Sequence, residues 1–112
     1  MGLKWTTWKK LAYSDKYYNI PKYDGPACYQ LRIGGPRGGN SHTVYVGETK
    51  DLNYRIRTYA VGGSHIAVKI LLEMRQGNVI EYKYTPTATK DVAKKIQDYL
   101  KDNYPDAFAW NS

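Results

Sequence analysis

The sequence has very little cysteine and histidine, and it has no long apolar run. Cys28 is the single cysteine among 112 residues, which excludes an internal disulfide framework and any zinc site built from several cysteines. The two histidines, His42 and His65, lie far apart and lack metal-binding spacing. No stretch is apolar enough for a membrane span or a signal peptide, so we expect a cytoplasmic protein with no membrane partner.

Several motifs of known chemistry are also absent. The segment "GGPRGG" has the glycines of a phosphate-binding loop, but it joins two predicted strands and does not open a helix. No nucleophile elbow is present, and no compact run of basic residues suggests a polybasic tail. These absences leave few enzyme classes that the sequence could support.

Positive charge and aromatic residues are plentiful. Seventeen Lys and Arg residues against ten Asp and Glu give a net charge of +7, and the chain holds 12 tyrosines and 3 tryptophans. A cationic surface favours anionic partners, and aromatic rings among cations suit stacking on bases and hydroxyl contacts to phosphate. Many of these rings could equally serve to build the core of a small domain.

The pattern of the chain predicts one α+β domain, with a small three-stranded antiparallel sheet flanked by helices. We expect strands over 27–33, 43–47 and 79–85, and helices over 51–61, 65–76 and 90–103, in the order β-β-α-α-β-α. Asp51, Ser64 and Thr89 are the expected N-caps of the three helices. Residues 25–112 form the predicted domain. Residues 1–24 are an extension, and its "KWTTWKK" is either a helix packed on the domain or an arm that contacts DNA.

A group of tyrosines and one arginine surrounds the first predicted hairpin. Tyr29 lies in the first strand and Tyr45 in the second, while Arg55 and Tyr59 are four residues apart on the first helix. Two neighbouring strands and the following helix would place these four side chains around one cleft. A cation beside a phenol favours the phenolate, and an arginine suits a phosphate, so the group is a candidate site for proton transfer at a phosphodiester.

The ordered set of segments resembles the GIY-YIG nuclease domain. "ACYQLRI", "VYVGET", "DLNYRIRTYA" and a late helix followed by "AWN" occur in that order over about residues 27–111. Ala27-Cys28-Tyr29 stands in place of GIY, and Tyr45-Val46-Gly47 stands in place of YIG. The resemblance implies a DNA endonuclease that uses one Mg²⁺ or Mn²⁺ ion per active site. The small nucleases of this kind that fit are restriction or phage and mobile-element enzymes, which would place the chain in the cytoplasm of a prokaryotic or phage-infected cell.

The resemblance also implies a role for each matching residue. Tyr29 and Tyr45 would line the site and activate the attacking water, and Arg55 would contact the scissile phosphate. Tyr59 stands where many members have histidine and some have tyrosine, so it would bind the phosphate or transfer a proton. Gly47 would permit a tight strand exit, and Asn111 would support the architecture or the site. Cutting of both strands would need a homodimer or two events.

The last implied role belongs to a glutamate on the late helix, which is the one metal ligand that the protein supplies. Gln97 occupies the aligned position, and its amide can coordinate a hard cation only without charge. Three explanations stay open: a deliberate Glu→Gln substitution, a natural DNA-binding relic, or a shifted register in which another acid binds the metal. The rival function is therefore a catalytically inactive nucleic-acid-binding module on the same fold.

The remaining predicted contacts to DNA are basic residues close in sequence to the cleft. They are Arg32, Arg37, Lys50, Arg57 and His65. Each of them could instead belong to an ordinary solvated surface, and His65 could instead cap its helix.

Overall fold

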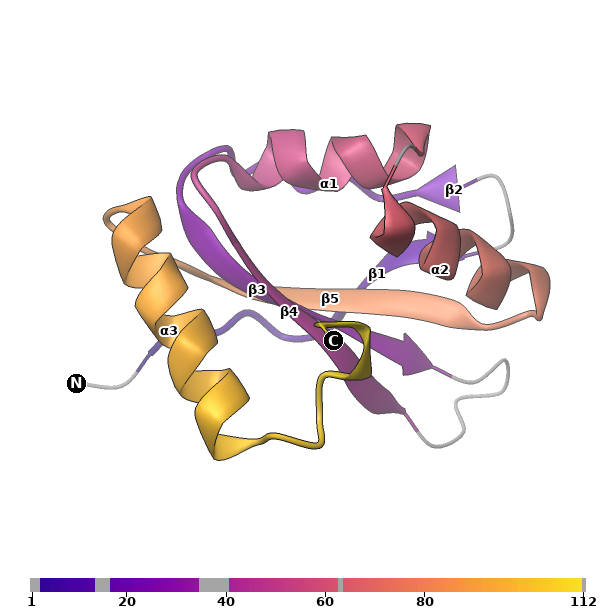
Figure 1. Cartoon of the computed structure of the whole chain (residues 1–112). Coiled ribbons are helices and arrows are strands. Elements are labelled where there is room, and N and C mark those ends of the chain that lie inside the picture. The colour runs from indigo at the N-terminus through magenta and orange to yellow at the C-terminus, as the bar shows by residue number, and fades with distance from the viewer. Residues whose placement is uncertain (1–2, 14–16, 35–40, 63, 112) are drawn as a thin grey trace.

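An antiparallel β-sheet runs through the centre of the structure, and three helices pack on it (Figure 1). The structure is a computed structural model, and it describes residues 3–13, 17–34, 41–62 and 64–111. The strands are β1 (Lys9–Tyr13), β2 (Tyr17–Tyr18), β3 (Ala27–Gly34), β4 (His42–Thr49) and β5 (Val79–Pro86). The helices are α1 (Leu52–Val61), α2 (His65–Arg75), α3 (Lys90–Asn103) and the short 3-10 helix η1 (Ala109–Asn111). No helix in these ranges is long and apolar enough to cross a membrane.

The sheet is larger than the sequence suggested. Its strand order is β2-β1-β5-β3-β4, so the prediction of three strands is wrong, although β2 is only two residues long. The three predicted strands are β3, β4 and β5, and they lie next to one another in the sheet. β3 pairs antiparallel with both β4 and β5. The added strands come from residues 1–24, where β1 pairs with β5. The α+β class is therefore confirmed, with a wider sheet.

The helices begin where the sequence predicted. The side chain of Asp51 accepts a hydrogen bond from the Tyr54 amide at 2.9 Å, and Ser64 and Thr89 accept corresponding bonds at the starts of α2 and α3. Such N-caps satisfy amide groups that have no partner within the helix. The cap at Asp51 fixes the start of α1 directly after β4, and this places the buried residues Leu52, Ile56 and Tyr59 toward the sheet.

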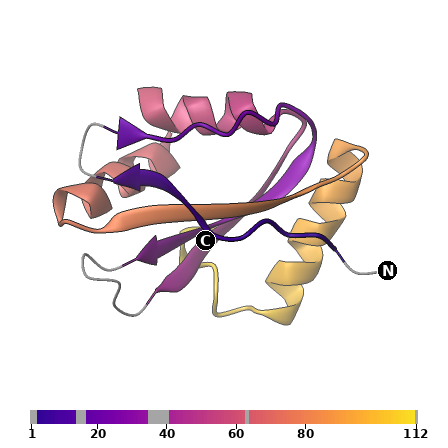
Figure 2. The ribbon, with the colours of Figure 1, turned by 180° about the vertical axis from the view of Figure 1, so that it is seen from behind.

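The N-terminal segment runs along the sheet in an extended conformation before it enters β1 (Figure 2). Thr6 is tied to β5, because its amide donates to the Tyr84 carbonyl at 2.9 Å and its hydroxyl accepts from the Tyr84 amide at 3.1 Å. Trp5 and Trp8 are half-buried in this segment. The expectation of a helix over "KWTTWKK" is therefore wrong, because the backbone pairs with β5.

The two faces of the sheet carry different helices. Tyr29 of β3 points into a core shared with Ile56 of α1 and Ile70 of α2. Its neighbour Cys28 points the other way, into a second cluster with Ala93 of α3. This alternation is the ordinary pleat of a strand. It places α1 and α2 on one face of the β3–β4 hairpin and α3 on the opposite face.

Candidate functional site

Three tyrosines from different elements meet on the α1 face of the sheet. We call Tyr29 of β3, Tyr45 of β4 and Tyr59 of α1 the tyrosine cluster. The hydroxyl oxygens of Tyr29 and Tyr59 are 2.5 Å apart, which is a short hydrogen bond. The ring centroid of Tyr29 lies 6.1 Å from that of Tyr45 and 6.5 Å from that of Tyr59. The structure thus brings together the three phenols that the sequence predicted as neighbours.

Gly47 makes room for the cluster. It lies directly opposite Tyr29 in the β3–β4 ladder. A Cβ atom at position 47 would lie 2.5 Å from both Cζ and the hydroxyl oxygen of Tyr29. Glycine is therefore required at position 47 because the Tyr29 ring approaches so closely. The reason expected from the sequence was a different one, a tight exit from the strand.

Burial keeps two of the phenols protonated. It is the largest cause that raises the pKa of Tyr29 well above the usual value for tyrosine, and Tyr59 and Tyr45 raise that pKa further. The pKa of Tyr59 is raised as well, again mainly by burial, although the bond from Tyr29 and the charge of Arg55 oppose the shift. The expected phenolate beside an arginine is therefore wrong for these two residues at neutral pH. Tyr29 and Tyr59 are hydrogen-bond donors, and half-buried Tyr45 is the phenol nearest to solvent.

Arg55 is the cation beside the tyrosine cluster. It is exposed on α1, and its charge acts on both Tyr29 and Tyr59. Within the described part of the chain, its guanidinium group has no ion pair or hydrogen bond to another side chain. A free guanidinium next to phenol donors is suited to bind an oxyanion such as phosphate.

Gln97 lies on α3, which covers the opposite face of the β3–β4 hairpin. It is half-buried, and no hydrogen bond joins it to the tyrosine cluster within the described ranges. The structure thus brings Tyr29, Tyr45, Tyr59 and Arg55 together but does not connect Gln97 with them. The β4 strand is the edge of the sheet, so a ligand that passes this edge could approach both faces.

The carboxylates do not form a metal site in the described ranges. No group of three or more His, Cys, Asp and Glu side chains there could hold an ion. Asp98 pairs with Lys94 at 3.3 Å, and Glu81 pairs with Arg32 at 2.8 Å. An Mg²⁺ or Mn²⁺ ion bound by these residues would therefore have one or two protein ligands and would take its remaining ligands from water and substrate phosphate.

Glu48 is the acid that the sequence analysis missed. It follows Gly47 in β4, and its Oε2 atom is buried without a hydrogen bond, while Lys90 Nζ lies 3.9 Å away. Glu48 also helps to raise the pKa of Cys28 to about 12, although burial is the main cause. Its position directly after the "YVG" tripeptide is the signal that could have revealed it. Glu48 is consequently the residue to test if another acid takes the metal role.

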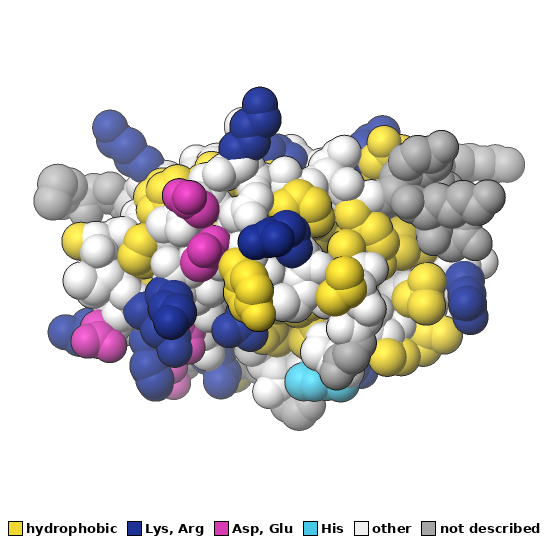
Figure 3. Space-filling view, turned by 90° about the horizontal axis from the view of Figure 1, so that it is seen from above, with side chains coloured by type: hydrophobic (Ala, Val, Ile, Leu, Met, Phe, Trp, Pro, Cys, Tyr) yellow, Lys and Arg dark blue, Asp and Glu magenta, His cyan; other side chains and the backbone are white. Residues whose placement is uncertain are grey.

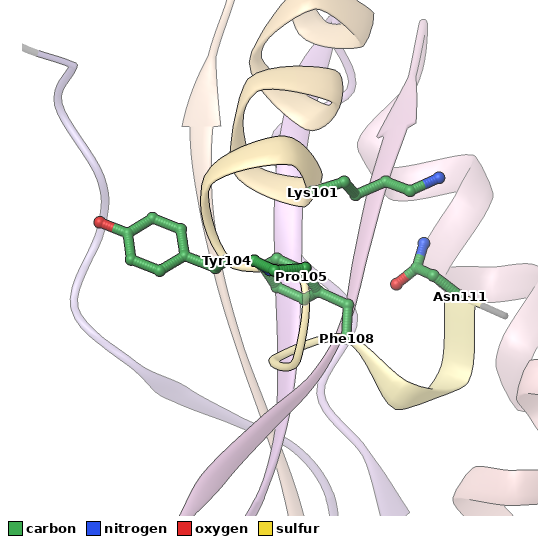
Figure 4. A pocket seen from close by; sticks show the side chains of 5 residues that line it. All are labelled: Lys101, Tyr104, Pro105, Phe108 and Asn111. Atoms are coloured by element: carbon green, nitrogen blue, oxygen red, sulfur yellow. The ribbon is translucent and has the colours of Figure 1, made fainter.

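Asn111 fastens the end of the chain to the edge of the sheet. Its Oδ1 accepts a hydrogen bond from the Val46 amide at 2.9 Å, and its Nδ2 donates to the Val46 carbonyl at 2.7 Å. The side-chain amide thus pairs with β4 as a short strand would. Beside it lies a hollow of about 190 Å³ lined by Lys101, Pro105 and Phe108, and the Lys101 side chain extends on the same side as Asn111 (Figure 4).

The predicted DNA contacts are distributed over more than one surface. Lys50 and Arg57 are exposed at the start and along the length of α1, and His65 is the exposed first residue of α2, where Ser64 is the cap. Basic side chains lie over the face that carries α1, next to exposed hydrophobic groups (Figure 3). Arg32 lies on the α3 face, where it pairs with Glu81. Arg37 lies outside the described residues.

Comparisons of the chain with protein-family models, with curated proteins and with solved structures found no match. The resemblance to GIY-YIG nucleases thus depends on the residues of this chain alone. The other support for a function is the geometry of the tyrosine cluster and of Arg55.

Proposed function

We propose that this chain is a DNA-binding protein of the GIY-YIG nuclease kind, and that its parent activity is endonucleolytic hydrolysis of phosphodiester bonds. The observation that carries the proposal is the meeting of Tyr29, Tyr45 and Tyr59 beside the free guanidinium of Arg55. A net charge of +7 supports an anionic partner. The order of strands and helices over residues 27–103 agrees with the resemblance.

Each residue has a distinct task in the proposed reaction. Arg55 binds the phosphate and stabilises the charge that grows on its oxygens in the transition state. Tyr59, held protonated by burial, donates a hydrogen bond toward the same group. Tyr45 is the phenol nearest to solvent, so it orients the attacking water. Gly47 and Asn111 hold the geometry without contact to the reacting atoms.

Gln97 limits this activity. In the related enzymes one divalent ion is held by a carboxylate of the late helix, and the neutral amide of Gln97 lacks the charge that attracts such an ion. We therefore propose that the chain binds DNA and cuts it poorly or not at all. The second candidate function, an inactive nucleic-acid-binding module, is favoured by the same residue and by the pairing of Glu48 with Lys90.

The decisive experiment is a plasmid-cleavage assay of the chain beside its Gln97→Glu variant, with Mg²⁺, with Mn²⁺ and with a chelator. We expect metal-dependent cutting only after Gln97→Glu, and loss of that cutting when Arg55→Ala is added. Arg75→Ala is the control, because Arg75 is exposed in the last turn of α2 and is not among the predicted DNA contacts. Nicked product would indicate one site acting alone, and linear product would indicate a homodimer or two events.

Other outcomes have distinct meanings. If the unmodified chain already cuts, the assignment of Gln97 is wrong, and loss of cutting in Glu48→Gln would identify the acid. If neither form cuts but both bind DNA through Arg55, the binding-module function replaces the nuclease. Absence of DNA binding in every form would refute both candidates.

A further inference from the structure

A hollow of about 300 Å³ lies on the α3 face of the sheet, away from the tyrosine cluster. Its lining includes Trp5 of the N-terminal segment, Gln30 of β3, Lys83 of β5, and Tyr104 and Phe108 after α3. Its volume is at the lower end of the range of roughly 300–1,000 Å³ that small-molecule sites occupy. Gln30 follows Tyr29 in the strand, so its side chain points to the opposite face. The hollow is therefore separate from the proposed site of hydrolysis.

Gln30 is the unusual residue of this hollow. It is only 8% exposed, yet its side-chain amide makes no hydrogen bond within the described ranges. Within the described residues, Glu48 Oε2 is the one side-chain oxygen or nitrogen that is both fully buried and without a hydrogen bond. The amide atoms of Gln30 are therefore not fully buried, and they face the hollow that Gln30 lines. An amide that opens onto a hollow can be hydrogen-bonded there by water or by a ligand. Gln30 thus presents one donor group and one acceptor to whatever enters.

Aromatic rings form the walls around this amide. Trp5 and Phe108 pack together in the cluster that joins α3 to the sheet. The Tyr104 ring points away from Lys101 and Asn111 (Figure 4), and it lines the hollow together with Trp5. Flat rings around a donor and an acceptor suit a planar ligand that stacks on them and has polar atoms on its edge.

Two basic residues, Lys83 and Arg32, lie beside the tryptophan rings of the N-terminal segment. Lys83 Nζ lies 5.4 Å from the centre of the Trp5 ring and 4.9 Å from that of Trp8. Arg32 lies 4.4 Å from the Trp8 ring centre and forms an ion pair with Glu81 at 2.8 Å. Burial lowers the pKa of Lys83, and the nearby charge of Arg32 lowers it further. Among the described residues Arg32 is paired with Glu81 and Lys83 has no carboxylate partner, so Lys83 is the cation that is available to an anion at the hollow.

We propose that this hollow receives a single unpaired nucleobase, with the Gln30 amide bonded to the base edge, aromatic walls against its face, and Lys83 near the phosphates of the nucleic-acid strand. The inference rests on the proposed function, because it takes nucleic acid as the partner. Glutamine pairs well with a base that offers a donor beside an acceptor, and unpaired bases are read by stacking and by edge contacts. A paired base is not accessible in this way, so the site selects single strands or bases extruded from a duplex.

The test compares the binding of two single-stranded oligonucleotides of equal length, one of ordinary adenine and thymine sequence and one with abasic sites throughout. Binding is followed by fluorescence anisotropy of a dye on the strand and by quenching of tryptophan fluorescence. We expect the ordinary strand to bind about tenfold more tightly than the abasic strand. Methionine resembles glutamine in length but has no hydrogen-bonding amide, so Gln30→Met should weaken this preference while stacking on the aromatic walls remains. Gln76→Met is the matched control, because Gln76 is exposed at the end of α2.

The Gln30→Met variant should fold, because it removes an amide that has no hydrogen-bond partner among the described residues, and its urea midpoint is measured to verify this. Equal binding of both strands to the unmodified chain, or an unchanged preference in Gln30→Met, would overturn the inference. A duplex whose binding depends on Arg55 is titrated in parallel, and this separates the two proposals. If the duplex binds through Arg55 but the single strands show no preference for bases, only the inference about the hollow is refuted. If the preference for bases depends on Gln30 but the duplex does not bind, only the proposed function is refuted.

Discussion

Replacement of Gly47 by alanine tests the structure at the centre of the tyrosine cluster. The new methyl group would lie 2.5 Å from Cζ and from the hydroxyl of Tyr29, and 2.8 Å from Cε1. Contacts below about 3 Å force one group to move, and the ring cannot move freely because Tyr29 is 1% exposed and bonded to Tyr59. We therefore expect Gly47→Ala to displace the Tyr29 ring and to break its bond with Tyr59.

The expected loss can be estimated from its two causes. Overpacking of a rigid core costs roughly 1–3 kcal/mol, and a broken buried hydrogen bond costs about 1 kcal/mol more. We expect the free energy of unfolding to fall by about 3 kcal/mol. With a urea m-value of about 1.5 kcal/mol/M, the midpoint would fall by about 2 M.

Urea unfolding followed by circular dichroism measures this shift, and Gly34→Ala is the matched control. Gly34 is also a buried strand residue, but its added methyl would meet the flexible end of Glu81 at 3.1 Å, which can give way. We expect the control to change the midpoint by less than about a third as much as Gly47→Ala, because only a side-chain terminus must move. Equal shifts in the two variants, or no shift in Gly47→Ala, would refute the argument that the Tyr29 ring requires glycine.

Two further predictions follow from the described contacts. Tyr29 and Tyr59 have pKa values raised above those of the unfolded chain, so their contribution to stability is complete below pH 10 and is lost as pH rises from there through the folded pKa. Urea unfolding from pH 8 to pH 11 should therefore show a decline that is smaller in Tyr59→Phe, and an equal decline in both proteins would contradict the burial of these phenols. Asn111→Ala removes two hydrogen bonds to Val46, so we expect a loss of about 1–2 kcal/mol. Hydrogen exchange at the Val46 amide should accelerate in this variant, whereas unchanged protection would show that other groups cover the edge of β4.

The sequence predicted the elements whose signals are local. Alternating residues identified β3, β4 and β5, and the caps Asp51, Ser64 and Thr89 identified the helix starts, because each signal lies within one turn or one strand. β1 was missed, since "KKLAY" has no clear alternation and its longer partner strand, β5, lies far along the chain. A strand that depends on such a distant partner leaves little trace in its own residues.

The candidate site was predictable to the same extent. Tyr29, Tyr45 and Tyr59 meet as expected, because they lie on a hairpin and on the helix that directly follows it. Their protonation was not predictable, since burial outweighs the charge of Arg55 and burial depends on the whole fold. Glu48 and Gln30 became visible only through the lack of partners for their polar atoms, which the sequence alone does not reveal.

The position of β5 has a consequence for how the protein is made. It lies between β1, which is synthesised early, and β3, yet it is itself synthesised after both and after α1 and α2. On the ribosome, β1 can therefore pair at first only with the two-residue strand β2, and its pairing with β5 must wait until β5 has emerged. Contacts between distant parts of a chain are formed slowly, because the intervening loop must first be closed. The hairpin of β3 and β4 and the helix α1 are all synthesised before β5, so the tyrosine cluster can form before the hollow around Gln30, which needs both ends of the chain.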